Sequence, residues 1–223
     1  MLSIIKAEHA LTIQPFISTK QTRYYLNGFA LQPTPLGGVV VATNGRILGV
    51  INATEAKVHA SVIVQLDKQF LAKCKTHHTQ ELSIYFDHST PKGAAYLAPS
   101  PEYWESTYTA PADLRLLPGL VATQIDVFID GTFPDWTRVM PVYDGKKHVN
   151  DSYSAKIIDA FSKVNGKHTV INIQSSAIGG PGLVFVRGRE DFIGVIMPIR
   201  GFEPKYQHWI DVVKWPTKVA KAA

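Results

Sequence analysis

Cys74, His77 and His78 are the residues of this chain whose types and spacing come nearest to a metal site. Thiolate and imidazole groups are good zinc ligands, but structural zinc sites draw their ligands from two clusters along the chain. Here all three residues fall within five positions, and no second cluster accompanies them. We therefore expect no bound metal, and a metal-dependent enzyme built around His77 and His78 is the least favoured alternative.

Motifs for other enzyme chemistry are also absent from the sequence. It contains no serine nucleophile elbow, no phosphate-binding loop and no paired-carboxylate motif. The segment GGPGLVF at residues 179–185 lacks the Lys-Ser/Thr pair that opens the helix of a phosphate-binding loop, so it predicts a hairpin turn. We therefore expect no catalytic residues and no cofactor, and a function in binding rather than in catalysis.

Two amphipathic helices are predicted, each with lysines outside its apolar stripe. In residues 65–78, Asp67 is a suitable N-cap and the stripe consists of Leu66, Phe70, Leu71 and Cys74. In residues 150–167 the stripe consists of Ile157, Ile158, Phe161 and Val164, and Gly166 is a natural stop. The lysines that point away from the stripes are Lys68, Lys73, Lys75, Lys156 and Lys163. Such lysines usually form only a solvated surface, although they could also contact phosphates.

These helices belong to a repeated unit. Phe70 and Ile157 are 87 residues apart, and so are Ile84 and Ile171 in the alternating segments ELSIYF and TVINI. A third copy is predicted at the N-terminus, where TRYYLNGFALQ and GGVVVATNGRILGVI form a hairpin around PTPLGG. Its helix must lie in EHALTIQPFISTK, where Pro15 makes it short or distorted.

Two Met-Pro pairs, Met140-Pro141 and Met197-Pro198, are predicted to close equivalent apolar strands, because proline cannot donate to a strand ladder. They are only 57 residues apart, so the earlier copy should contain about 30 extra residues. Residues 89–121 are rich in proline and aromatic side chains and are predicted to be a structured loop insertion.

Composition limits the class of protein. The chain has 223 residues, of which 45% are hydrophobic and 18% are charged, so it can form one sizeable core. Its single cysteine excludes an intramolecular disulfide, which favours a reducing compartment. No segment is predicted to span a membrane and the N-terminus does not resemble a signal peptide, so we expect a cytoplasmic protein. The net charge of +5 suits a polyanionic partner.

Four motifs resemble a known family, the bacterial sliding clamp or beta subunit of DNA polymerase III. The segments TRYYLNG, VATNGRILGV, FPDWTRVMP and VIMPIRG are similar to that family's RYYLNG, ATDGHRLAV, FPDYRRVLP and VVMPMR, in the same order. The resemblance covers roughly residues 14–200. It implies about three half-domains, where a full-length clamp chain has six.

The resemblance implies a hydrophobic cleft that binds short linear peptides of DNA polymerases and other replication proteins. Carried over by motif, its residues would be Leu26, Thr43, Gly45, Arg46, Leu48, Pro134, Arg138, Val139, Val195, Ile196, Met197, Pro198, Ile199 and Arg200. Apolar walls with a few polar groups suit such a site, although apolar residues beside strand ends more often belong to a core. Asn44, Trp136 and Ile199 depart from the family's usual Asp, Tyr and Met, as does GRIL from GHRL.

In the family the helices line a central hole and contact double-stranded DNA without reading its sequence, so the five lysines named above become DNA-binding candidates. We expect an α+β fold of the DNA-clamp type, with antiparallel sheets and short helices on one face. The expected parts are a clamp-type domain at 1–141, a half-domain at 142–203 and an extension at 204–223.

The expected function is a DNA sliding clamp or a clamp-like processivity factor. The alternative is a non-encircling decoy that only captures clamp-binding peptides. Family rings close from twelve half-domains, so a chain with three would need four copies, joined head to tail in a homo-oligomeric ring.

Overall fold

The computed structural model describes residues 1–19, 21–76, 81–100, 112–141, 153–166, 169–175 and 180–199, which form three related units. The first unit consists of β1 (Leu2–Lys6), α1 (Ala7–Ile13), η1 (Gln14–Phe16), η2 (Gln21–Leu26), β2 (Phe29–Thr34), β3 (Gly37–Thr43) and β4 (Ile47–Ala53). The second consists of β5 (Val62–Val64), α2 (Lys68–Thr76), β6 (Leu82–Asp87), β7 (Ala94–Pro99), η3 (Leu114–Leu116) and β8 (Ala122–Ile125). A connector holds β9 (Phe128–Ile129) and η4 (Trp136–Val139), and the third unit consists of α3 (Ala155–Ser162), β10 (Ile171–Ser175), β11 (Gly182–Val186) and β12 (Phe192–Ile196).

The helices form where the sequence predicts them. The backbone N–H of Phe70 donates to Asp67 Oδ1 at 2.7 Å, so Asp67 caps α2 as expected. Pro15 lies inside η1 directly after α1, which explains why the first helix has only seven residues. The apolar stripes of α2 and α3 face the core through Phe70, Cys74 and Phe161.

The first two units exchange strands. In the four-stranded sheet, in the order β1-β6-β7-β8, β1 of the first unit pairs with β6 of the second, with Ile4 opposite Tyr85. In the eight-stranded sheet, in the order β10-β11-β12-β4-β3-β2-β5-β9, β5 of the second unit pairs with β2 of the first. Each unit therefore completes the sheet of the other.

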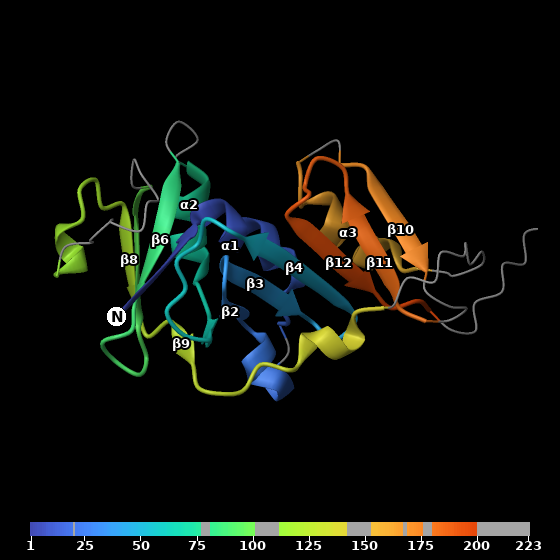
Figure 1. The fold of residues 1–223 in the computed structure, drawn as a ribbon, viewed down its shortest axis with the longest axis horizontal. Helices are drawn as coiled ribbons and strands as arrows, with labels where there is room; N and C mark the ends of the chain where they lie inside the picture. Colours follow the sequence, from blue (N-terminus) through green and yellow to red (C-terminus); the bar gives the residue numbers. More distant parts are fainter. Residues whose placement is uncertain are drawn as a thin grey trace, which may run out of the picture.

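The third unit joins the first through the last strand of each. β12 pairs antiparallel with β4, and Gly194 lies opposite Gly49 in the middle of this pair. A Cβ atom on Gly194 would overlap the ring of Phe161, so glycine lets α3 pack directly on the sheet. The eight-stranded sheet thus crosses the predicted domain boundary at residue 141. In Figure 1 this third unit lies at one end of the long axis and β8 lies near the other.

The three helices cover one side of the two sheets, which we call the helix side, and the opposite side is the outer side. The main core lies on the helix side, where its aromatic members include Phe16, Phe29, Phe70, Phe161 and Phe192. On the outer side of the four-stranded sheet, Leu114 and Leu117 around η3 cover Ile4, Tyr85 and Ala98. The predicted α+β arrangement, with antiparallel sheets and short helices on one face, is confirmed.

A buried arginine ties the third unit to the first. Arg189 makes two 2.8 Å hydrogen bonds to the carboxylate of Asp191. Its Nη1 also donates to the carbonyl oxygen of Val164 at 2.9 Å and to Thr12 Oγ1 at 3.2 Å, and it lies 3.2 Å from Glu8 Oε1. The guanidinium thus links α1, the end of α3 and the turn between β11 and β12.

Two predictions about the repeat are wrong. Residues 94–99 form strand β7, so the segment 89–121 is not a loop throughout, and the long connection of this unit is the 22 residues between the end of β7 at Pro99 and the start of β8 at Ala122. Met140 caps the 3₁₀-helix η4 rather than closing a strand, and the strand of the second unit that corresponds to β12 is β8. Proline can follow the end of a 3₁₀-helix as readily as the end of a strand, because proline has no N–H to donate and fits wherever no hydrogen-bond donor is needed.

Candidate peptide- and nucleic-acid-binding surfaces

The turn between β3 and β4 has a fixed hydrogen-bonded shape. Asn44 Oδ1 accepts the N–H groups of Arg46 at 3.0 Å and Ile47 at 3.2 Å, and Thr43 Oγ1 donates to the Ile47 carbonyl at 2.7 Å. Gly45 has a φ of +84°, which favours glycine, and a Cβ there would lie 3.0 Å from Arg23 Nη1. Asn44 accepts these bonds through an oxygen that aspartate would also offer, so this departure from the family motif preserves the turn.

Four of the predicted cleft residues are buried. Leu48 and Val195 are opposite each other in the β4–β12 pair and belong to a cluster on the outer side of the eight-stranded sheet. Phe133, Trp136 and Met140 of the connector pack on this cluster, and Trp136 Nε1 donates to Gln32 Oε1 at 2.9 Å. The other two buried residues of the predicted cleft are Leu26 and Ile196. Ile196 faces the core on the helix side. These four residues can support a binding surface but offer little contact area of their own.

Three other predicted residues are exposed apolar side chains. Val139 is 47% exposed, Met197 is 42% exposed and Ile199 is 46% exposed. The N–H of Met197 donates to the carbonyl of Arg46 at 3.0 Å, which brings the end of β12 beside the β3–β4 turn. We call Val139, Met197 and Ile199 the apolar rim, because they are exposed apolar side chains on the two segments that adjoin the β4–β12 junction, the connector and the residues after β12.

The remaining predicted cleft residues lie close to the rim in sequence. Pro134 and Arg138 are exposed on the connector, and Arg138 Nε lies 3.3 Å from Asp135 Oδ2. A hydrogen bond from Thr137 lowers the pKa of Asp135, which also caps η4. Pro198 is partly exposed, and Arg200 lies outside the described residues.

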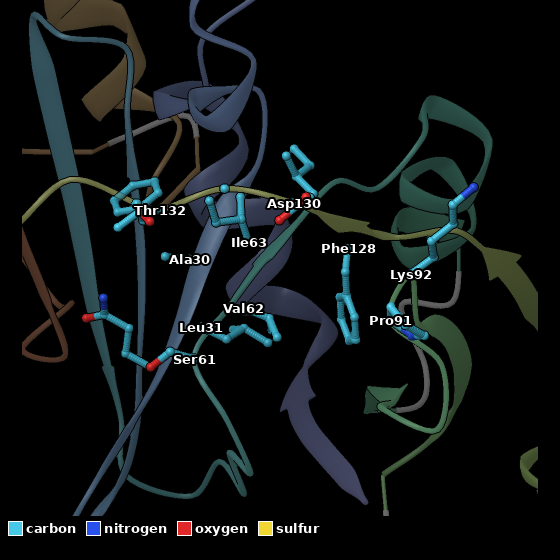
Figure 2. A pocket seen from close by; sticks show the side chains of 14 residues that line it. Ala30, Leu31, Ser61, Val62, Ile63, Pro91, Lys92, Phe128, Asp130 and Thr132 are labelled. Carbon is cyan, nitrogen blue, oxygen red and sulfur yellow. The ribbon is translucent and has the colours of Figure 1, made fainter.

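A larger pocket, which the sequence motifs do not mark, lies beside β2, β5 and β9. Its volume is about 660 Å³, and Figure 2 shows Phe128 between Val62 and Pro91 in this view. Residues from four separate parts of the chain line it, namely Ala30, Leu31, Gln32, Ser61, Val62, Ile63, Pro91, Lys92, Phe128, Ile129, Asp130, Gly131, Thr132 and Phe133. Its walls meet only in the folded protein, so no local pattern could have predicted it.

The five predicted DNA-binding lysines are all exposed. Lys68, Lys73 and Lys75 are on α2, Lys156 is on α3, and Lys163 is the C-cap residue of α3. Lys163 Nζ lies 2.6 Å from Asp159 Oδ2, and this hydrogen bond lowers the pKa of the Asp159 carboxyl. Part of the charge of α3 is therefore compensated locally.

A second pocket, of about 420 Å³, gathers basic groups from two units. Lys156 and Lys163 of α3 line it together with Arg46 and Asn44 of the β3–β4 turn and with Thr19. Arg46 was predicted as a peptide-cleft residue, but here it shares a pocket with two of the lysines. No local pattern predicts this cluster, because residue 46 and α3 are more than 100 positions apart.

Metal binding around Cys74 has little support from its surroundings. Cys74 is buried, and burial raises the pKa of its thiol to about 12, so the thiolate that binds metals is disfavoured. His77 and His78 lie outside the described residues. Within the described ranges, no group of three histidine, cysteine or acidic residues could hold a metal ion, and no helix is long and apolar enough to cross a membrane.

Comparison with solved structures identifies the fold as that of DNA polymerase sliding clamps. A ligand-bound sliding clamp from Pseudomonas aeruginosa matches 89% of this chain with a TM-score of 0.58 and 15% identity. The DNA polymerase III beta clamp from Bartonella birtlesii, bound to griselimycin, matches 89% with a TM-score of 0.56 and 16% identity, and the Bacillus subtilis clamp matches 91% with 0.57 and 12%.

These likenesses concern the fold, because the identities are low. The chain spans 66% of the Pseudomonas clamp, just under two thirds of its length. No protein-family model and no curated protein matches the sequence. The resemblance inferred from the four motifs is nevertheless confirmed at the level of the fold, which is specifically that of the polymerase III beta subunit.

Proposed function

We propose that this chain is a non-enzymatic, clamp-like replication factor that binds short linear peptides of DNA polymerases or other replication proteins at the apolar rim. The main support is the exposure of Val139, Met197 and Ile199 at the β4–β12 junction, over a buried and therefore rigid floor. A fixed apolar surface beside a polar turn suits an extended peptide with two or three apolar side chains.

A titration with a fluorescent peptide of the Gln-Leu-x-Leu-Phe type tests this proposal. We expect a micromolar dissociation constant, equivalent to about −8 kcal/mol, because a small, open groove buries few side chains. Met197→Ala should weaken binding about tenfold, since it removes one of the three exposed apolar side chains of the rim. Leu116→Ala is the matched control, because Leu116 is exposed but lies on η3 in the second unit.

The same titration separates the rim from the larger pocket. Lys92→Ala changes the pocket beside β9 and leaves the rim intact. If Lys92→Ala weakens the peptide while Met197→Ala does not, the peptide binds in the larger pocket and the rim assignment is wrong. Absence of any binding by the wild type would contradict peptide capture itself.

The proposed partner on the helix side is double-stranded DNA, bound without regard to sequence. Its support is the set of exposed lysines on α2 and α3, together with the pocket that joins Lys156 and Lys163 to Arg46. Exposed lysines next to phosphates release counterions, which gives sequence-independent binding.

A peptide-capturing decoy that does not encircle DNA is the second candidate. It is favoured by the three units per chain and by the open sheet ends at β8 and β10 among the described residues. Retention on closed circular DNA, compared with retention on the same DNA after linearisation, distinguishes the two. A clamp is lost when the circle is cut, whereas a decoy is retained on neither.

A further inference from the structure

A serine hydroxyl joins three segments of the chain at the start of the first unit. Ser3 of β1 is fully buried, and its Oγ lies 2.8 Å from Nε2 of His88, the residue that follows β6. The same Oγ accepts the backbone N–H of His59 at 2.9 Å, and His59 lies in the connection between β4 and β5. We call Ser3, His59 and His88 the strand latch, because they hold β1 to its two neighbouring segments.

Backbone hydrogen bonds join the same three segments. The N–H of His88 donates to the carbonyl oxygen of Met1 at 3.0 Å. Ile4 and Lys57 exchange two hydrogen bonds of 2.7 and 2.9 Å, in which the N–H of each residue donates to the carbonyl oxygen of the other. β1 is one end of the four-stranded sheet, so it can leave β6 without breaking another strand pair of that sheet. The amides of Ile4 and Lys57 therefore report on whether β1 is in place.

The hydrogen bonds of Ser3 determine which ring nitrogen of His88 carries the proton. Oγ already accepts the N–H of His59, and among the described residues the only acceptor for the hydroxyl proton is His88 Nε2. We therefore assign the hydroxyl as the donor to Nε2 and place the proton of the neutral imidazole on Nδ1. A second proton on His88 would turn Nε2 into a donor and leave a buried hydroxyl without an acceptor, which costs free energy.

The charges around His88 also oppose a second proton. The titratable groups that act on its ring are the imidazole of His59, the amino group of Met1 and the carboxylate of Asp87. Of these, only the carboxylate favours the charged imidazole, and the ring centroids of His59 and His88 are 5.6 Å apart. β9 contributes the ring of Phe128 at 4.8 Å. Lys92 and Asp126 flank that ring, and their Nζ and Oδ2 atoms lie 3.9 Å apart, so their charges offset each other.

These surroundings give the latch a defined dependence on pH. Partial burial, the ring of His59 and the amino group lower the pKa of His88 below its ordinary value of about 6.5. When β1 opens, the ring returns to water and its pKa rises toward that ordinary value. The open state therefore takes up a proton before the closed state does, and opening is favoured as the pH falls below about 6.5.

We propose that the strand latch is a pH-sensitive switch, in which protonation of His88 releases β1 from β6 and from the connection between β4 and β5 while the rest of the protein stays folded. The proton enters at Nε2, breaks the hydrogen bond from Ser3 and places an imidazolium beside the ring of His59. Release opens the edge of β6 and uncovers Ile4 and Ile5, which are buried in the closed state. The latch shares no residue with the apolar rim or the predicted DNA-binding lysines, so the proposal does not rest on peptide or DNA binding.

Hydrogen exchange of the full-length chain tests the switch, with each rate divided by the intrinsic rate of that amide at the same pH. Between pH 7.5 and pH 5 the protection of the Ile4 and Lys57 amides should fall about fivefold or more, because one proton taken up on opening changes it by up to about tenfold per pH unit. The amides of β3 and β4 should change less than about twofold, since these strands lie in the other sheet. In His88→Gln, whose side chain can still bond to Ser3 but stays neutral, the pH dependence at Ile4 and Lys57 should disappear.

His9→Gln is the matched control. His9 is a buried histidine on α1, and burial lowers its pKa as well, but it lies outside the latch. Its replacement should leave the pH dependence at Ile4 and Lys57 intact. Circular dichroism at pH 7.5 establishes that each variant is folded.

A second latch variant guards against misfolding of His88→Gln. Ser3→Ala keeps both latch histidines but removes the hydroxyl, so it should weaken the protection of Ile4 and Lys57 at pH 7.5 and flatten its pH dependence. Equal protection at pH 7.5 and pH 5 in the wild type would overturn the proposal. A pH dependence that persists unchanged in His88→Gln and Ser3→Ala, or that is lost in His9→Gln, would overturn it as well, because the acid-sensitive group would then be a different one.

Discussion

Gly194 lies where a side chain would separate α3 from the eight-stranded sheet. A Cβ at this position overlaps the Phe161 ring, and a Cβ on the opposite residue, Gly49, would lie only 3.0 Å from ring atoms of Phe16. Phe161 packs edge-on to Phe16 with ring centroids 5.0 Å apart, so neither ring has room to move. One missing methyl group on each strand thus lets α3 and η1 pack directly on the eight-stranded sheet.

We expect Gly194→Ala to lower the free energy of unfolding by about 1–3 kcal/mol, because overpacking of the core outweighs the reduced entropy of the unfolded chain. Urea denaturation followed by tryptophan fluorescence measures the change. Gly182→Ala is the control, since its Cβ would meet only side-chain atoms at 3.0–3.4 Å that can adjust. Equal losses in the two variants would contradict the close packing at Phe161.

The Arg189–Asp191 pair should make stability depend on pH. Hydrogen bonds from Arg189 lower the pKa of Asp191 below its unfolded value of about 3.9. A lowered carboxyl pKa stabilises the fold above the unfolded pKa, and this stabilisation is lost as the pH falls through the folded pKa. Asp191→Asn should therefore cost about 1–3 kcal/mol at pH 7, allowing for solvent screening of the partly exposed carboxylate.

Urea titrations of wild type and Asp191→Asn between pH 3 and pH 7 measure that dependence. The difference between the two proteins should be constant near neutrality and should shrink below about pH 4. A difference that stays the same down to pH 3 would show that Asp191 acts through packing or through its backbone rather than through its charge.

The sequence motifs selected candidate site residues without indicating which of them are exposed. The motifs selected Met197 and Val139, which are exposed, but also Leu48 and Val195, which lie beneath the connector. All four are apolar residues at strand ends or in the connector, and periodicity alone cannot tell which side of a sheet a later segment will cover. The pocket shared by Arg46 and α3 depends in the same way on contacts that are distant in sequence.

At the scale of elements, the local pattern predicted the helices and strands but not their partners. The spacing of 87 residues between Ile84 and Ile171 correctly related β6 to β10, and Asp67 correctly marked the start of α2. Alternation cannot reveal that β1 pairs in one sheet while β2 to β4 form another, because a strand has the same pattern in either sheet. The strand β7 was missed because the prolines around it suggested a loop.

Cys74 provides a test of how firmly α2 is packed. Burial raises the pKa of its thiol to about 12, and only the thiolate reacts with Ellman's reagent. In the native protein at pH 8 we expect labelling at least a hundredfold slower than in urea, with a rate set by opening of α2. Asp67→Ala, which removes the cap of α2, should accelerate labelling.

That labelling experiment has a control in the next helix along the chain, α3. Ser154→Ala alters the N-cap residue of α3, which lies in another unit, and should leave the reactivity of Cys74 unchanged. Rapid native labelling that does not respond to Asp67→Ala would contradict a packed α2.

At the scale of the whole molecule, the lysines of two units are proposed to act as one DNA-binding surface. Replacing Lys73, Lys75, Lys156 and Lys163 by glutamate should abolish association with duplex DNA at low salt, while peptide affinity stays within twofold. In the wild type, the logarithm of the binding constant should fall by about 0.9 per phosphate contact for each tenfold rise in salt. Fluorescence anisotropy with labelled duplexes measures both the loss of DNA binding in the variant and the salt dependence of the wild type.

The control for this experiment is a charge change on the outer side of the sheets. Arg115 lies on η3 and forms an exposed pair with Asp113, so the double change Asp113→Ser with Arg115→Glu alters charge without touching the helices. DNA binding that weakens as much in this control would place the DNA surface elsewhere. Loss of peptide binding in the quadruple variant would indicate misfolding.

The exchange of strands between the first two units also affects how the chain folds during synthesis. β1 ends at Lys6, but its partner β6 begins only at Leu82, so at ~5–20 residues per second roughly 4–15 s pass before β1 can pair with β6. Throughout that interval Ile4 and Ile5, both buried in the finished protein, lack their partners on β6. The nascent first unit therefore exposes the apolar side chains of β1, to which chaperones bind. Slow translation of the residues before Leu82 should increase aggregation.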